Sequence, residues 1–331
     1  MNDSKQLLMT SGLGANGFLE GDLALQGIPQ KYAQFRDCFL CGPRGNQMYD
    51  AVVQVAIDTE WYPHGDRNCI LCYQYAAVFE DRAVNRIVYM RPGERLTLPD
   101  LIERALASLH GGEVPTDFRS KYPRVLVVLI AHNFVAEWSA LKDRDEKYIV
   151  DRLKPIRKCP VTGIDPIEFF SPVLGNVFVH VYDTMLLAPV GFQSLDKLAS
   201  LLVDESLNGD EDEIEIAGKI EISQFYKENM NVFLADDPEG FEKYALRDTE
   251  LTLKLFVYLQ ESLNNLAYGK IKRVFKTLAS AAVKGFQVKH PKFKKYRQAL
   301  QEDAFKDAYR LIMRSYHGGR NEGFLIGDSR D

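Results

Sequence analysis

The stretch AVVQVAIDTEW, residues 51–61, decides the fold. Residues 51–57 are apolar except for Gln54, as is typical of a strand buried in a sheet, and two acids, Asp58 and Glu60, follow at its end. Residues two apart on a strand point to the same face, so these two carboxylates can share metal ions. The alternative interpretation of the pair is an exposed turn with two solvated acids.

Strand and helix patterns follow one another along the rest of the chain. Five strands are expected, at residues 51–58, 68–79, 85–91, 124–132 and 178–187. Helices are expected at residues 101–109, 134–142, from Ser194 onward, and at 240–263. The first three strands form a meander, and the hydroxyl of Ser194 suits an N-cap. The order β-β-β-α-β-α-β-α predicts an α/β domain with a mixed five-stranded sheet.

The sequence divides into three parts around this domain. Residues 1–50 show no clear period, so we interpret them as an N-terminal extension; residues 51–263 form the expected compact domain, and residues 264–331 a basic helical segment. With 46% hydrophobic and 26% charged residues, the chain is typical of a soluble globular protein. We expect no transmembrane segment, no secretory signal and, with five cysteines, a reducing intracellular setting.

Charge is distributed unevenly along the sequence. The net charge is -5, yet residues 270–320 carry 14 Lys and Arg against three acids, Glu302, Asp303 and Asp307. This asymmetry is typical of a protein that holds a polyanion on one part and metal-binding acids on another. Basic helix faces that are merely solvated are the alternative. The acid-rich residues 204–218 are interpreted as a solvated surface loop.

Two further acids extend the chemistry of the first pair. In YALRD, residues 244–248, Tyr244 and Asp248 lie four apart and therefore on one helical face. Glu137 comes after the apolar residues 125–131 and lies one turn into the next expected helix. Hydrolysis of a phosphodiester needs a hydroxide nucleophile and charge stabilisation, which two divalent ions supply, and carboxylates suit Mg²⁺ or Mn²⁺. An ordinary amphipathic helix, with Tyr244 packed and Asp248 solvated, is the alternative.

The ordered set DTE (58–60), HNFVAE (132–137) and YALRD (244–248) resembles the three exonuclease motifs of the DEDD superfamily, in its tyrosine-containing branch. That branch includes the proofreading domains of family B DNA polymerases, and the set is most similar to the protein-primed phage and plasmid type. Two positions depart from the pattern, with Ala136 where an aromatic residue is expected and Glu137 where Asp is usual. The resemblance implies a ribonuclease-H-like (DnaQ-like) fold and a metal-dependent 3′–5′ exonuclease acting on DNA.

The resemblance also implies a role for individual residues. Asp58 would bridge two metal ions, Glu60 and Asp248 would hold the ion that activates water, Glu137 would support the other ion, and Tyr244 would orient the water. Contacts with a single-stranded or frayed DNA 3′ end would come from His132, Asn133, Ser194 and Leu195, with Phe134 or Trp61 stacking on a base, unless these two rings belong to the core. Tyr316, Gly318, Gly319 and Arg320 resemble the Tyr-x-Gly-Gly element that binds template DNA between the exonuclease and polymerase regions.

No polymerase motif follows that element. The chain is therefore expected to be the N-terminal half of a larger replicative polymerase, as a fragment or as a stand-alone exonuclease, in a phage, plasmid or bacterial cytoplasm. A polymerase module in cis is the expected partner, and no membrane is involved. Two alternatives stay open: an inactive exonuclease fold that serves as a DNA-binding platform, and an RNA-directed 3′–5′ exonuclease.

The cysteine pairs Cys38/Cys41 and Cys69/Cys72 have the spacing of a structural zinc site. However, Cys69 and Cys72 lie three apart on an expected strand, so their side chains point to opposite faces. A structural Zn²⁺ ion is the less favoured interpretation, and Cys72 is expected to be a small buried hydrophobe.

Overall fold

The computed structural model describes Leu25 and residues 28–40, 47–65, 67–144, 154–155, 167–203 and 220–292. The chain divides into two compact units, Met1–Ala281 and Ala282–Asp331. The first unit contains the sheet and the three expected acidic motifs, so the fold described below is the fold of this unit.

A single mixed sheet forms the centre of this unit. Its strands are β1 (Ala51–His64), β2 (Arg67–Phe79), β3 (Arg82–Tyr89), β4 (Arg124–Ala131), β5 (Lys154–Pro155), β6 (Ile167–Ser171) and β7 (Gly175–Asp183). They lie in the order β3-β2-β1-β4-β7-β6-β5. The meander β1-β2-β3 is antiparallel, β4 and β7 run parallel to β1, and β6 is antiparallel to β7. The mixed sheet confirms the expected α/β class, but the expected number of five strands is wrong, because β5 and β6 extend the sheet beyond β7.

The three parallel strands end at the same edge of the sheet. Ala131 at the end of β4 is paired with Asp183 at the end of β7. The pairing of β1 with β4 stops at Ala56, so Asp58 and Glu60 lie just beyond it while β1 continues along β2. The register of β1 and β2 shifts immediately after Glu60, and bulges of this kind often re-aim side chains beside active sites. Carboxyl ends of parallel strands are where open α/β sheets bind ligands.

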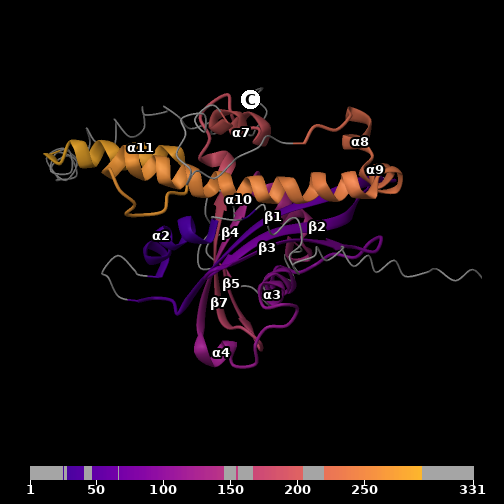
Figure 1. Cartoon of the computed structure of the whole chain (residues 1–331), viewed down its shortest axis with the longest axis horizontal. Coiled ribbons are helices and arrows are strands. Elements are labelled where there is room, and N and C mark those ends of the chain that lie inside the picture. Colours follow the sequence, from indigo (N-terminus) through magenta and orange to yellow (C-terminus); the bar gives the residue numbers. More distant parts are fainter. Residues whose placement is uncertain are drawn as a thin grey trace, which may run out of the picture. The chain divides into compact units, whose positions relative to one another are not determined.

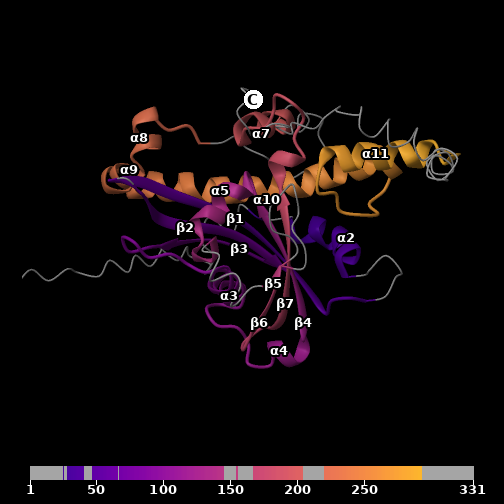
Figure 2. The ribbon, with the colours of Figure 1, turned by 180° about the vertical axis from the view of Figure 1, so that it is seen from behind.

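Helices cover both faces of the sheet. The main ones are α2 (Ile28–Leu40), α3 (Leu98–Leu109), α5 (Phe134–Ala140), α7 (Leu195–Val203) and α10 (Pro238–Tyr268). Apolar side chains of α3 pack on one face, and those of α2, α7 and α10 pack on the other. Figure 1 shows α10 crossing one face of the sheet with α3 on the opposite face, and the reverse view in Figure 2 shows α5 beside β1.

The remaining helical elements follow or precede these. They are α4 (Phe118–Lys121), η1 (Lys142–Arg144), η2 (Thr184–Leu186), α8 (Gln224–Glu228), α9 (Met230–Asp236) and α11 (Leu278–Lys289). Ser194 caps α7 as expected, since its Oγ accepts a hydrogen bond from the Lys197 N–H at 3.3 Å. No helix among the described residues is long and apolar enough to cross a membrane.

Helix α2 lies in the stretch for which the sequence analysis expected no element. Ile28, Tyr32, Phe35 and Phe39 recur at intervals of four, three and four residues, which places them on one helical face. All four are buried in the core beneath α10. Part of residues 1–50 therefore belongs to the core of the domain. The acid-rich residues 204–218, Cys41 and the part of the expected basic segment after residue 292 lie outside the described residues.

Candidate metal centre

Three carboxylates from two distant motifs meet at the edge where the parallel strands end. Asp58, Glu60 and Asp248 each offer an oxygen atom, and these atoms all lie within 4.8 Å of one another. Glu60 and Asp248 are buried, and Asp58 is half-buried. The expected convergence of the DTE and YALRD motifs is therefore present in the structure.

The position of Asp248 depends on how α10 is fixed against the sheet. Asn85 on β3 donates a hydrogen bond from Nδ2 to the Leu246 carbonyl at 2.8 Å and accepts one at Oδ1 from Thr249 Oγ1 at 3.0 Å. These contacts lie on both sides of Asp248 in the sequence, so they fix the rotation and the height of the helix at this residue. Sequence reasoning missed Asn85, because the signal is only a single polar residue in a strand pattern.

Tyr244 lies one helical turn before Asp248 and faces the same carboxylates. Its ring is buried and packs edge-on against Phe233 at 6.2 Å between centroids. Burial raises the pKa of the phenol far above its usual range, and the charges of Glu60, Asp248 and Asp58 raise it further. Tyr244 therefore stays neutral and keeps its O–H as a hydrogen-bond donor.

Glu137 lies beside the three carboxylates rather than among them. It is the fourth residue of α5 and is buried, and its Oε2 accepts a hydrogen bond from Thr59 Oγ1 at 2.7 Å. Burial raises its pKa well above the usual range, and the charges of Asp58, Glu60 and Asp183 act in the same direction, while the bond from Thr59 opposes them. Thr59 stands between the two acids of the DTE motif, and sequence reasoning assigned it no role.

Asp183 holds the start of α5. Its Oδ1 accepts from the N–H groups of Asn133 at 2.9 Å and Met185 at 3.0 Å, and its Oδ2 accepts from the Phe134 N–H at 3.0 Å. Asn133 has a left-handed backbone with φ 68° and an exposed side chain. Left-handed conformations cost free energy for most residues but suit Asn, and they concentrate at functional sites. The sequence analysis expected Asn133 to contact DNA, and its amide is accessible for that contact.

His132 connects this region to the segment before α7. Its Nδ1 lies 2.9 Å from Thr184 Oγ1, and its Nε2 lies 2.9 Å from the Gln193 carbonyl. The latter bond places the expected DNA contacts Ser194 and Leu195 next to the HNFVAE motif. Both ring nitrogens of His132 have partners inside the protein, so the ring fixes the position of the segment before α7.

The remaining expected DNA contacts differ in accessibility. Phe134 is 0% exposed and packs against Trp138, so its expected contact with a base is not supported and the core interpretation fits it better. Trp61 is 48% exposed next to Glu60, Ser194 is exposed, and Leu195 is buried in the core. Tyr316, Gly318, Gly319 and Arg320 lie outside the described residues. Cys72 is buried opposite Glu60, as expected for a small hydrophobe.

The donor set fits a divalent cation. Three negative charges within a few ångströms repel one another, and burial strengthens that repulsion, because a low dielectric screens it less than water does. A bound cation would attract all three carboxylates and outweigh their mutual repulsion. Oxygen-only ligation by carboxylates is typical of hard ions such as Mg²⁺ and Mn²⁺.

Comparisons with known proteins give a distant structural likeness. No family model matches this chain, and no curated protein matches it. Among solved structures, Phi29 DNA polymerase complexed with single-stranded DNA matches at 15% identity with a TM-score of 0.35, over 73% of this chain and 36% of that chain. The same polymerase complexed with primer-template DNA and incoming nucleotide substrates matches at 13% identity with a TM-score of 0.35, over 74% and 35%. The chain thus spans about a third of the length of these polymerases, and similarity this low does not transfer an activity.

Proposed function

We propose that this chain is a divalent-metal-dependent 3′–5′ exonuclease that removes nucleotides from DNA 3′ ends, as the proofreading part of a family B DNA polymerase. The observation that carries the proposal is the meeting of Asp58, Glu60 and Asp248, with Tyr244 facing them. These residues come from motifs at opposite ends of the domain. Their identity and order match those of a tyrosine-type exonuclease.

The carboxylates define what the centre would hold. Asp58, Glu60 and Asp248 would ligate Mg²⁺ or Mn²⁺, with Glu137 supporting a second ion. When bound, such ions supply a hydroxide nucleophile at neutral pH and stabilise charge on the leaving oxygen. Removing one of the three carboxylates would therefore disable the centre.

The chain's own residues position the reactants. The neutral phenol of Tyr244 donates a hydrogen bond that can orient a water molecule beside Asp248 and Glu60. Trp61 follows Glu60 on β1 with its ring exposed, and Asn133 precedes α5, the helix that carries Glu137, with its amide accessible. A ring stacked on a base contributes about 1–3 kcal/mol per base and tolerates any sequence, as the removal of any mismatched nucleotide requires.

A second candidate is an inactive fold that binds DNA without cutting it. The observation in its favour is the place of Glu137, which is bonded to Thr59 and lies beside the three-carboxylate group. If Glu137 does not support a second ion, the chain binds one ion and the hydrolysis is lost.

Cleavage of a 5′-labelled single-stranded DNA tests the proposal. We expect a ladder that shortens from the 3′ end with Mg²⁺ or Mn²⁺, disappears with EDTA, and is reduced at least a thousandfold in Asp58→Ala. Asp117→Ala, which removes an exposed acid at the far end of the sheet, is the matched control and should cut normally. An RNA oligomer of the same sequence distinguishes the DNA from the RNA activity.

Two results would count against the proposal. Full activity in Asp58→Ala would show that the cleavage arises elsewhere. DNA that is bound but never cut with either metal would instead favour the inactive platform.

A further inference from the structure

The loop that follows α10 is held in place by two buried side chains. Helix α10 ends at Tyr268, Gly269 adopts φ 70°, and the chain turns back along the last turns of the helix. We call residues 269–274 the basic loop, because it carries Lys270, Lys272 and Arg273. It belongs to the same compact unit as the carboxylate centre.

Gln260 and Asn264 hold this loop by its backbone. Gln260 donates from Nε2 to the Phe275 carbonyl at 2.7 Å and accepts from the Phe275 N–H at 2.8 Å. Asn264 accepts at Oδ1 from the N–H groups of Lys272 at 3.0 Å and Arg273 at 3.2 Å, and donates from Nδ2 to the Arg273 carbonyl at 2.7 Å. Both amides are fully buried, and a satisfied buried network of this kind fixes one backbone conformation.

The three cations on this fixed backbone are exposed. Lys270, Lys272 and Arg273 form no ion pair within the described part of the chain, whereas Lys31 pairs with Glu261 and Arg124 with Asp50. Lys272 lies over the ring of Tyr268 at 5.7 Å and Arg273 over the ring of Phe275 at 5.2 Å, and these contacts leave both side chains exposed. Three like charges within four residues still repel one another. A rigid cluster of exposed cations is the arrangement that binds phosphate backbones.

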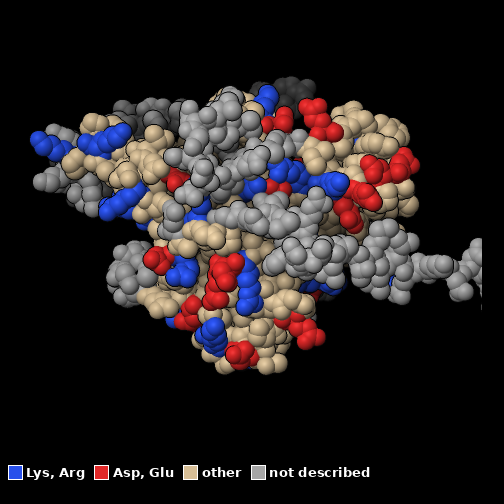
Figure 3. Space-filling model, in the orientation of Figure 1, with Lys and Arg blue, Asp and Glu red and all other residues tan. Residues whose placement is uncertain are grey.

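Charge changes sign from one end of α10 to the other. Its N-terminal end is surrounded by acids, namely Glu228, Asp236, Asp237, Glu239 and Glu242. Figure 3 shows red side chains gathered over α8 and α9 at that end, whereas the basic loop follows the other end of the helix. A DNA strand whose 3′ end lies at Asp58 and Asp248 is therefore repelled at the N-terminal end of α10 and attracted toward the basic loop.

We propose that the basic loop binds the phosphodiester backbone of the DNA strand on the 5′ side of the end held at the carboxylates. This inference rests on the proposed exonuclease function. Asn264 follows Asp248 by 16 residues, so the loop lies about 24 Å along the helix from the site. At roughly 3.4 Å per nucleotide this is about seven nucleotides, and fewer if the strand is stretched.

The test compares strand lengths in the variant Lys270→Gln/Lys272→Gln/Arg273→Gln. Binding of labelled DNA strands of roughly four and fifteen nucleotides is measured in EDTA across a salt series, and cleavage of the same strands is measured with Mn²⁺. For the longer strand we expect a tenfold or greater loss of affinity and a salt slope smaller by about 2, since each phosphate contact on single strands contributes about 0.7. Binding and cleavage of the shorter strand should not change, because it does not reach the loop.

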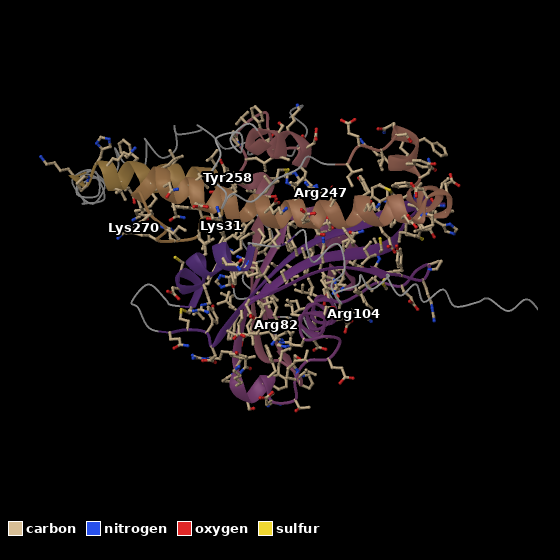
Figure 4. The ribbon with its side chains drawn as sticks, in the orientation of Figure 1. Lys31, Arg82, Arg104, Arg247, Tyr258 and Lys270 are labelled. Atoms are coloured by element: carbon tan, nitrogen blue, oxygen red, sulfur yellow. The ribbon has the colours of Figure 1, made fainter. Side chains whose placement is uncertain are left out.

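The matched control replaces Arg104, Arg119 and Lys121 by Gln. These three exposed cations lie on α3 and α4, and Figure 4 shows Arg104 on the opposite side of the sheet from Lys270. This control should bind both strands like the unmodified protein. All six replaced side chains are exposed, so both variants should keep the melting temperature of the unmodified protein.

Each outcome has one meaning. Unchanged affinity and salt slope for the longer strand in the loop variant would overturn the inference, and so would an equal loss for both lengths or an equal loss in the control. Absence of cleavage in the unmodified protein would count against the exonuclease, whereas a length-dependent loss of binding would still assign the loop to the DNA backbone.

Discussion

Glu137 is a carboxyl group whose charge is unfavourable unless a cation is present. It is buried, and the charges of the acids Asp58, Glu60 and Asp183 raise its pKa further. One hydrogen bond from Thr59 favours the ionised form but does not outweigh burial. The folded metal-free protein therefore binds a proton at Glu137 more tightly than the unfolded chain does.

This shift predicts a pH-dependent stability in EDTA. Folding raises the pKa of Glu137 above its unfolded value of about 4.3. Below that value the group is protonated in both states and does not lower the free energy of unfolding. As the pH rises from there through the folded pKa, the free energy of unfolding falls. Glu137→Gln keeps the shape and an acceptor for Thr59 but cannot ionise. We expect it to melt at a higher temperature than the unmodified protein near pH 8, with the difference vanishing toward pH 4.

Thermal denaturation in EDTA over that pH range measures the difference. Glu103→Gln serves as the control, since Glu103 lies on α3 away from the centre, and should show no such trend. A Glu137→Gln variant less stable than the unmodified protein at pH 8 would show that the carboxylate is compensated in the folded state.

At the residue scale, the sequence predicted the acidic residues of the centre better than the residues that form hydrogen bonds with them. Asp58, Glu60, Tyr244 and Asp248 could be predicted because strand and helix periods place them on defined faces. Thr59 points to the other face of β1, and its bond to Glu137 depends on how α5 packs against the strand. Such contacts between distant segments leave no periodic signal in one sequence.

Helix α10 is the element on which the centre depends most. Residues 248–257 are all buried, including the charged pair Glu250 and Lys254. Glu250 accepts from Lys254 Nζ at 2.7 Å and also pairs with Arg247. Arg247 and Asp248 are neighbours, so this ion-pair network lies next to the proposed metal ligand on the same helix.

Removing the central carboxylate should destabilise the domain. Glu250→Gln takes from two largely buried cations the carboxylate they share, and breaking a buried pair costs about 3–5 kcal/mol. We expect a loss near 3 kcal/mol in urea denaturation. Glu261→Gln on the same helix breaks the more exposed pair with Lys31, at 3.9 Å, and should cost less than about 1 kcal/mol. Equal costs in the two variants would show that burial does not govern the network.

At the element scale, long periodic segments could be predicted and short or irregular ones could not. The five expected strands and the helices α3, α5, α7 and α10 are present close to their expected positions. Strand β6 was missed because its five residues are too short for a pattern and are defined by their pairing with β7. Helix α2 did carry a signal, since Ile28, Tyr32, Phe35 and Phe39 have helical spacing, but the surrounding polar residues obscured it.

On the scale of the whole molecule, the centre joins the sheet to its covering helix. Asp58 and Glu60 lie on β1, and Asp248 lies on α10, far away in the sequence. Without a cation, their mutual repulsion pushes the helix away from the sheet edge. With a cation, the same three groups become a cross-link between two segments that are distant in the unfolded chain.

Metal binding should therefore stabilise the entire sheet-containing unit. An ion that binds only the folded state adds RT ln(1 + [L]/Kd), or about 2.7 kcal/mol at a concentration one hundred times Kd. We expect Mn²⁺ to raise the melting temperature in a saturating, concentration-dependent manner, measured by thermal denaturation against an EDTA reference. Asp248→Asn should abolish the rise, because it removes the ligand that α10 contributes, whereas Asp117→Asn should leave it intact. If Asp248→Asn gains as much stability from Mn²⁺ as the unmodified protein, the ion acts elsewhere and the three carboxylates do not form a metal centre.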